Sequence, residues 1–147
     1  MSSINVRFHP NAEGLIKVLG PLETEIMQNL WENSKGTVRS VHRVLSERRS
    51  LAYTTVLTCM QRLTKKGLLI QTPSETGPAY IYTPAISMPD FHKLVVQQVL
   101  TSLLEDYGEL VITYIVEYLG RHDPSGLSRL HELLHQQEEP KYATTQD

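Results

Sequence analysis

The hydrophobic pattern changes period at Gly67, and this change constrains the fold more than any other feature of the chain. Before Gly67, apolar residues recur at helical spacing in three segments, residues 21–33, 37–49 and 52–67. After it, the β-prone runs "LLIQTP" and "AYIYTP" flank the turn cluster "SETGP", which is typical of a β-hairpin. Three helices followed by a hairpin predict a winged helix-turn-helix over residues 20–86.

The first two predicted helices begin with residues that favour a helix start. Pro21 fits the first helical position, and Glu23 and Glu25 follow in the first turn, where the helix dipole favours acidic groups. Thr37 is a good N-cap for the second helix, because its hydroxyl can accept a hydrogen bond from a backbone N–H. Residues 1–19 carry no comparable pattern and are predicted to be an N-terminal extension.

Residues 87–138 are predicted to form three further helices, and residues 139–147 a flexible tail. Pro89 fits a helix start, and Asp123 with Pro124 fits the N-cap and first position of the last helix. The middle segment, "GELVITYIVEYLG", is rich in β-branched residues and admits a strand. We favour a helix because this segment lies between two helices, so the predicted fold is mostly α.

The second half of the chain carries more apolar side chains than a piece of about 60 residues can bury alone. The economical explanation is a homodimer in which two chains share a core between their C-terminal helices. In the alternative, these helices pack on the winged helix of their own chain. The predicted dimerisation residues are Phe91, Leu94, Val95, Val99, Leu103, Val111, Ile115, Leu119, Leu130 and Leu134.

The net charge of −2 hides an asymmetry between the two halves. Residues 1–86 contain ten Lys/Arg and six Asp/Glu, a net charge of +4, whereas residues 87–147 contain four and ten, a net charge of −6. A basic first half indicates that only this half meets a polyanion. The alternative is a chance distribution of solvated charge.

Composition and motifs exclude several classes of protein. The longest apolar run is far shorter than the ~20 residues of a membrane span, and no signal pattern is present, so we expect a cytoplasmic protein without membrane contact. The single cysteine allows no internal disulfide and no cysteine-based metal cluster. No phosphate loop, nucleophile elbow or dense His/Asp/Glu cluster occurs, so we expect neither an enzyme nor a cofactor.

Residues 52–67 separate into two faces on a helical wheel at ~100° per residue. One arc carries hydroxyls and cations and no acidic residue, and the opposite arc carries core candidates. Thr, Arg and Lys side chains contact base edges and phosphates of duplex DNA. The helix is therefore predicted to enter the major groove of double-stranded DNA through Thr54, Thr55, Thr58, Arg62, Lys65 and Lys66.

Four residues outside this arc complete the predicted DNA-binding set: Tyr53, Thr37, Arg39 and Tyr80. Arg39 lies on the polar face of the second helix. Tyr80 and Tyr82 alternate on the second strand, so one can pack on the core while the other touches the DNA backbone. The tip "PSETG" contains Glu75 and no cation, which favours a light backbone contact at most.

Over roughly residues 19–84, the chain resembles the penicillinase-repressor family of bacterial transcription factors (BlaI, MecI, CopY). The shared marks are "LE-x-E-I-M-x-x-LW", "TV-x-x-V", "AYTTV-x-T-x-x-x-RL-x-KKGL" and the "Y-x-Y" of the hairpin. The resemblance implies a homodimeric winged-helix repressor that binds a palindromic operator. It also implies that Thr54, Thr55, Thr58 and Arg62 contact DNA and that the C-terminal helices form the dimer interface.

The chain departs from this family in two places. Copper-responsive members carry a C-terminal cysteine cluster, whereas this chain ends in "HQQEEPKYATTQD", so copper sensing is not expected. Antibiotic-responsive members are cleaved near an Asn-Phe pair, and the comparable place here is Thr113–Tyr114. A sensor protease as partner therefore stays an open question.

Two further features have a structural and a functional interpretation. Cys59 falls on the core arc, where it is a small buried hydrophobe or, in the alternative, a redox site. His131 and His135 share a helical face, but a stable zinc site needs a third ligand, so we expect exposed histidines and no metal site. The alternatives for the whole chain are a winged-helix protein-interaction module, or the same repressor with a redox or small-molecule effector.

Overall fold

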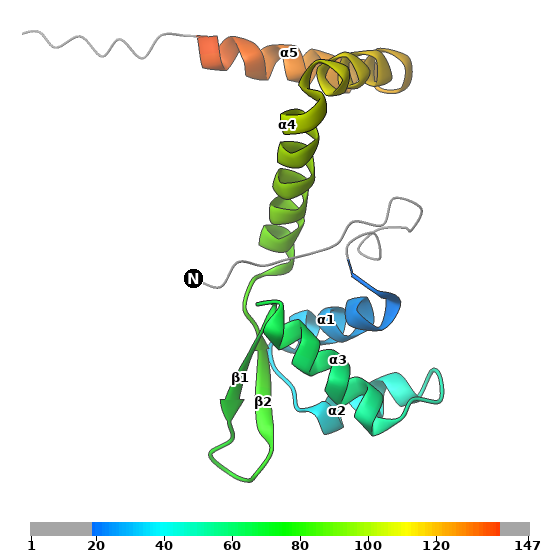
Figure 1. Cartoon of the computed structure of the whole chain (residues 1–147), viewed down its shortest axis with the longest axis vertical. Coiled ribbons are helices and arrows are strands. Elements are labelled where there is room, and N and C mark those ends of the chain that lie inside the picture. The colour runs from blue at the N-terminus through cyan, green and yellow to red at the C-terminus, as the bar shows by residue number, and fades with distance from the viewer. Residues whose placement is uncertain (1–18, 139–147) are drawn as a thin grey trace, which may run out of the picture. The chain divides into compact units, whose positions relative to one another are not determined.

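The computed structural model describes residues 19–138, and it divides after Val99 into two compact units that we describe separately (Figure 1). The predicted flexible tail and, apart from Leu19, the predicted N-terminal extension lie outside the described residues. No helix within residues 19–138 is long and apolar enough to span a membrane.

Three helices and a hairpin at the start of the first unit confirm the predicted winged helix-turn-helix. The helices are α1 (Pro21–Asn33), α2 (Val38–Ser46) and α3 (Tyr53–Lys65). The strands β1 (Leu69–Pro73) and β2 (Tyr80–Pro84) pair antiparallel, with Gln71 opposite Tyr82. Gly36, between α1 and α2, adds a short bridge to β2 through two hydrogen bonds with Tyr82, of 3.0 and 2.8 Å.

The ends of these helices follow from local chemistry. Thr37 caps α2, because its hydroxyl oxygen accepts a hydrogen bond from the Ser40 backbone N–H at 3.1 Å. Pro21 is the first residue of α1, as predicted. Gly67 stands after α3 with φ of 83°, a left-handed conformation that favours glycine. This glycine lets the chain turn from α3 into β1.

The core of the first unit lies between the three helices and the hairpin. Its fully buried side chains include Ile26, Met27, Leu30, Val41, Val56, Met60, Leu63 and Leu68. Tyr82 of β2 joins them at 2% exposure, whereas Tyr80 is 50% exposed. Of the two tyrosines that alternate on β2, Tyr82 is therefore the one that packs in the core.

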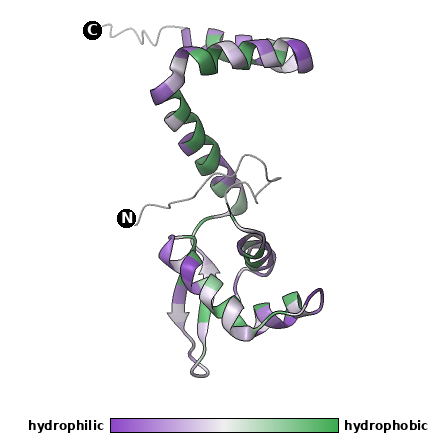
Figure 2. Cartoon of the chain, turned by 45° about the vertical axis from the view of Figure 1, so that its right-hand side comes forward, coloured by the Kyte–Doolittle hydropathy of each residue, from purple (hydrophilic) through white to green (hydrophobic). Residues whose placement is uncertain are grey.

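Helix α4 (Met88–His122) runs for 35 residues and is interrupted at Tyr107, whose φ of −136° and ψ of 32° are not helical. The predicted first and second C-terminal helices are thus joined end to end, and the segment that admitted a strand is helical. Hydrophobic residues recur along both parts of this helix (green in Figure 2). The third predicted helix is α5 (Pro124–Glu138).

Phe91 corrects one prediction for the dimer interface. Its side chain is 0% exposed and belongs to the core of the first unit, where its ring lies 5.7 Å from that of Trp31. A side chain without exposed surface cannot contact a second chain, so Phe91 stabilises the winged helix instead. Val95, one turn later, is half-buried against the same core.

Asp123 caps α5, as predicted. Its Oδ1 accepts hydrogen bonds from the Gly126 N–H at 2.9 Å and the Ser125 hydroxyl at 2.8 Å. The Gly126 backbone bond, followed by the Ser125 bond, lowers the pKa of the Asp123 carboxyl. A lowered pKa means that the charged cap stabilises the folded state above the pKa of the unfolded chain.

We expect this stabilisation to be lost as the pH falls below about 4 and through the lowered pKa of Asp123. Thermal unfolding followed by circular dichroism should then show that wild type loses its helices at a lower temperature at acid pH than at neutral pH. In Asp123→Asn, which keeps an N-cap oxygen but cannot titrate, the corresponding part of the acid-dependent loss should be absent. An identical acid profile in both proteins would contradict the role of this carboxylate.

Candidate nucleic-acid interface

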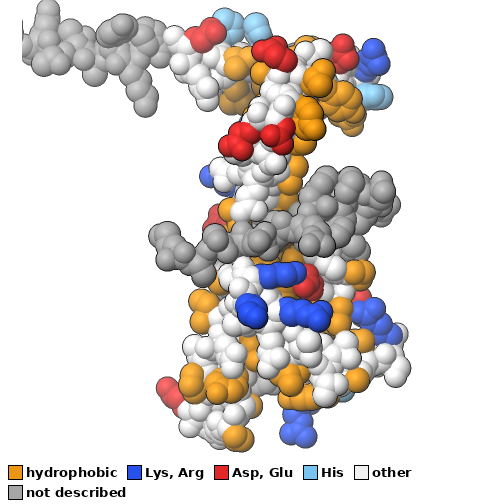
Figure 3. Space-filling view, viewed as in Figure 1, with side chains coloured by type: hydrophobic (Ala, Val, Ile, Leu, Met, Phe, Trp, Pro, Cys, Tyr) orange, Lys and Arg blue, Asp and Glu red, His pale blue; other side chains and the backbone are white. Residues whose placement is uncertain are grey.

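Helix α3 presents one polar face to solvent. Val56, Cys59, Met60 and Leu63 anchor it in the core. Its exposed face carries the side chains of Thr54, Thr55, Thr58, Gln61, Arg62 and Lys65. Lys and Arg side chains gather over this helix (blue in Figure 3), and α3 itself contributes no acidic residue. The predicted separation of a polar face from a core face is therefore present in the structure.

The start of α1 borders this face. Gly20 to Glu23 line an open hollow of about 490 Å³ together with Thr54, Thr55, Thr58, Cys59 and Arg62. The wheel of α3 alone gave no sign of this neighbour, because it comes from a distant part of the sequence. Glu23 thus places one carboxylate beside a face that is otherwise free of acidic groups.

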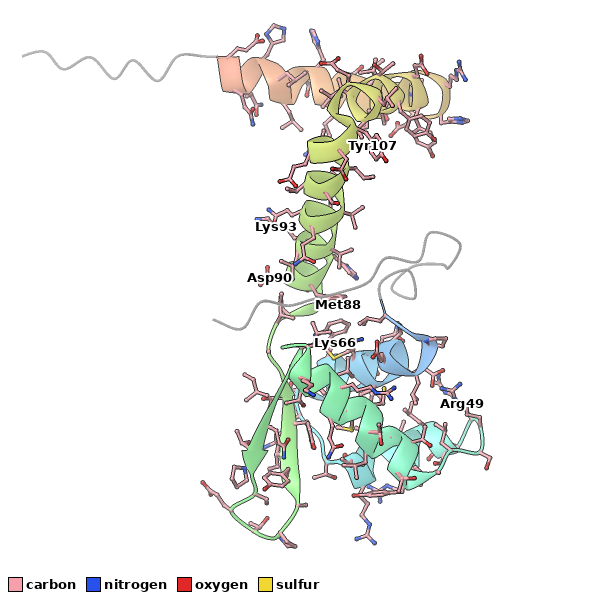
Figure 4. All side chains as sticks on the ribbon, viewed as in Figure 1. Arg49, Lys66, Met88, Asp90, Lys93 and Tyr107 are labelled. Atoms are coloured by element: carbon pink, nitrogen blue, oxygen red, sulfur yellow. The ribbon has the colours of Figure 1, made fainter. Side chains whose placement is uncertain are left out.

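Lys66 is held by that carboxylate. Its Nζ donates to Glu23 Oε1 at 2.8 Å, and Glu23 Oε2 also accepts from the Gly20 N–H at 3.2 Å. Figure 4 shows Lys66 at the end of α3, on the side of α1. Within residues 19–138, neither Arg62 nor Lys65 forms an ion pair. The structure therefore separates Lys66, which links α3 to α1, from the two cations that stay available to a polyanion.

Tyr53 and Thr37 also have partners within the chain. The Tyr53 ring meets the edge of His42 at 5.8 Å between centroids, and it is still 47% exposed. His42 in turn contacts the Leu51 carbonyl through Nε2 at 2.7 Å, which fixes the loop before α3. The Thr37 hydroxyl accepts the hydrogen bond that caps α2, so Thr37 has a structural role in this helix.

Arg39 and Tyr80 are exposed on α2 and β2, respectively. The residues of the hairpin tip, 75–79, are exposed as well. These groups lie outside the polar face of α3, and a contact between them and DNA stays a prediction.

Cys59 lies behind the polar face, with its side chain 8% exposed. Burial, followed by the Glu23 carboxylate, raises the pKa of the Cys59 thiol from 9.0 to about 11. Because the thiolate is the reactive form, this environment disfavours a redox role at neutral pH and favours a small buried hydrophobe.

We expect iodoacetamide at pH 8 to modify Cys59 much more slowly in the folded protein than in the urea-unfolded chain. A folded-state pKa raised above the unfolded value also means that the Cys59 thiol stays protonated to a higher pH in the folded state than in the unfolded chain. The free energy of unfolding should therefore fall as the pH rises from 9.0 to about 11. The difference in pH dependence between wild type and Cys59→Ala isolates the contribution of the thiol to stability. Equal alkylation rates in the folded and the unfolded protein would contradict the burial of Cys59.

His131 and His135 face each other on α5, with their Nε2 atoms 3.2 Å apart. Glu138 approaches His135 Nδ1 at 3.8 Å. Within the described chain, no group of three His, Cys, Asp or Glu residues is arranged to hold a metal ion. A structural metal site with all its ligands from residues 19–138 is therefore not formed.

Known proteins are similar to this chain in sequence. The model of the family described as penicillinase repressor matches residues 19–136. The transcriptional regulator BlaI of Mycobacterium tuberculosis, in two strains, is 37% identical over 114 residues, which cover 76% of this chain and 80% of that protein. The solution structure of the DNA-binding domain of the repressor BlaI is 28% identical and covers 57% of this chain and 92% of that one, with a TM-score of 0.42. The monomeric form of Bacillus licheniformis BlaI in complex with the blaP half-operator is 27% identical with the same coverage and a TM-score of 0.41.

The winged-helix fold, with a polar face on α3 that carries no acidic residue, is typical of the class of winged-helix transcriptional regulators. The family match spans most of the chain, and it places the protein within that class. The chain belongs to the penicillinase repressor family and is a BlaI-like transcriptional regulator. This family is one of repressors and is not a class of enzymes.

Proposed function

We propose that the protein is a cytoplasmic homodimeric repressor that binds a palindromic operator with α3 in the major groove. The observation that carries the proposal is the exposed face of α3, where Thr54, Thr55, Thr58 and Arg62 stand together without an acidic residue from that helix. The resemblance of these positions to DNA contacts of the family supports the same assignment. Residues 20–86 then form the DNA-binding domain.

Each group on this face has a defined role in the proposed complex. Threonine hydroxyls donate to or accept from base edges, and their methyl groups contact the methyl of thymine. Arg62, which has no ion pair among the described residues, can bind the two acceptors of a guanine edge or a phosphate. Lys65, at the end of the helix, suits a phosphate.

The homodimer is proposed from the exposed apolar side chains of the second unit. Of the predicted dimerisation residues in this unit, Leu103 and Leu134 are exposed, whereas Val111, Ile115, Leu119 and Leu130 are half-buried. Further exposed apolar residues are Leu100, Leu104, Leu110, Ile112, Tyr114, Val116, Tyr118 and Leu133. So many exposed apolar side chains on one small unit are typical of a surface that a partner covers.

Nuclease protection of the DNA upstream of its own gene tests the proposal. We expect protection of a two-fold symmetric site and a linear fall of log K with log salt concentration. Lys65→Ala should reduce the salt slope by about one for each half-site. Absence of sequence-specific protection, with binding to an acidic protein instead, would favour a protein-interaction module.

A further inference from the structure

We propose that Trp31 is a positioning residue for operator recognition, because it fixes the direction in which α4 leaves the winged helix. The inference rests on the proposed function, since that direction sets the distance between the two α3 helices of a dimer on DNA. Trp31 itself lies in α1 and is not part of the polar face of α3. Its effect on binding therefore passes through the geometry of the dimer.

The first contact joins Trp31 to the link between β2 and α4. The indole Nε1–H donates to the Ile86 carbonyl at 2.9 Å, across 55 positions of sequence. Ala85, next to Ile86, donates its backbone N–H to the Leu68 carbonyl at 2.9 Å. The link is therefore held from both sides, by α1 and by the start of the hairpin.

The second contact joins Trp31 to the first turns of α4. Its ring meets the fully buried ring of Phe91 at 5.7 Å and an interplanar angle of 41°. The Phe91 backbone N–H donates to the Ser87 carbonyl at 2.9 Å, which closes the first turn of α4. Met88 and Asp90 mark this first turn in Figure 4, and the Asp90 N–H contacts the Ser87 hydroxyl at 3.3 Å. The residues of α4 up to Val99 accordingly belong to the first unit.

The position of Trp31 differs from that of an ordinary core residue. Its side chain is only half-buried and borders an open groove of about 800 Å³, lined also by Gln28, Glu32 and residues 84–89. A phenylalanine would fill the same space, but only the indole N–H can donate a hydrogen bond to the carbonyl of this connecting segment. The indole thus supplies a directional bond at the joint and a ring contact beyond it.

A small change at this joint has a large effect along α4. From Phe91 to Val99, the last residue of α4 in the first unit, the helix rises about 12 Å, at about 1.5 Å per residue. A tilt of about 10° at its base displaces that point by about 2 Å, which is more than half of the rise of one base pair, about 3.4 Å. A loosened joint would therefore blur the spacing at which two half-sites are read.

The test compares full-length wild type with Trp31→Phe, which keeps a ring against Phe91 and removes the N–H. The probes are the protected operator, the same operator with one or two base pairs inserted or removed between its half-sites, and a single half-site duplex. For Trp31→Phe we expect half-site affinity within about twofold of wild type and operator affinity lower by about fivefold. Wild type should prefer one spacing sharply, whereas Trp31→Phe should bind the neighbouring spacings almost equally well.

Gln28→Ala is the matched control, since Gln28 lines the same groove on α1 and should leave the spacing preference unchanged. Phe91→Leu loosens the joint from its other side and should flatten the spacing preference as Trp31→Phe does. An equal loss on the half-site and on every spacing, or no loss at all, would overturn the positioning role. Failure of wild type to bind any duplex would overturn the proposed function itself, and this role with it.

Discussion

Arg62→Ala is expected to weaken operator binding by about 1–3 kcal/mol, the range for one bidentate arginine contact to a base. Arg62 is exposed on the face that α3 presents to solvent, and no described acidic residue forms an ion pair with it. Its guanidinium is therefore free to bind DNA without first leaving a partner. Titration of the mapped operator at fixed salt concentration measures the change.

Arg129→Ala is the control for Arg62→Ala. Arg129 is an exposed arginine on α5, so its removal takes away the same charge from a different unit. We expect operator affinity to stay close to wild type, because Arg129 is not among the residues proposed to contact DNA, and exposed charges more than about 10 Å apart are largely screened at ordinary salt. Equal losses in the two variants would indicate that net charge, and not the polar face of α3, governs binding.

Leu63→Ala should lower the free energy of unfolding of the winged helix by about 2–5 kcal/mol, as for other leucines that are removed from a packed core. Leu63 is fully buried in α3, on the side opposite Arg62 and Thr58. Since small domains are stable by only about 5–15 kcal/mol, this loss leaves a substantial unfolded population. Urea unfolding followed by circular dichroism gives the change.

Thr58→Ala tests the other side of the same helix. Thr58 is exposed, so its truncation should change the free energy of unfolding by no more than about 0.5 kcal/mol. Its operator affinity should nevertheless fall, because a hydroxyl of the polar face is lost. A Leu63→Ala protein as stable as Thr58→Ala would contradict the assignment of the two faces.

The sequence was sufficient to predict features that depend on local chemistry. Pro21 and Thr37 mark the helix starts where they occur, and the change of period at Gly67 marks the end of α3. The two faces of α3 follow from helical spacing alone. The cap at Asp123 was likewise visible, because a short polar side chain before Pro124 satisfies the first N–H groups of a helix.

Features that depend on contacts between distant residues were not predictable in this way. The bond of Lys66 to Glu23 spans 43 positions, and that of Trp31 to Ile86 spans 55. Phe91 shares the helical period of a dimer surface, yet its side chain packs into the winged helix. Periodicity indicates that a residue is buried, but it does not say against which element.

The bridge between Gly36 and Tyr82 has a consequence for how such a protein can be changed. A Cβ at Gly36 would lie 3.0 Å from the Leu30 side chain and 3.1 Å from the Ser40 hydroxyl, so any larger residue there would have to displace these two side chains. The base of the hairpin is therefore fixed, while its tip over residues 75–79 is exposed. Loops of other length or charge could be grafted at this tip to extend the protein along a duplex, with the core and α3 left as they are.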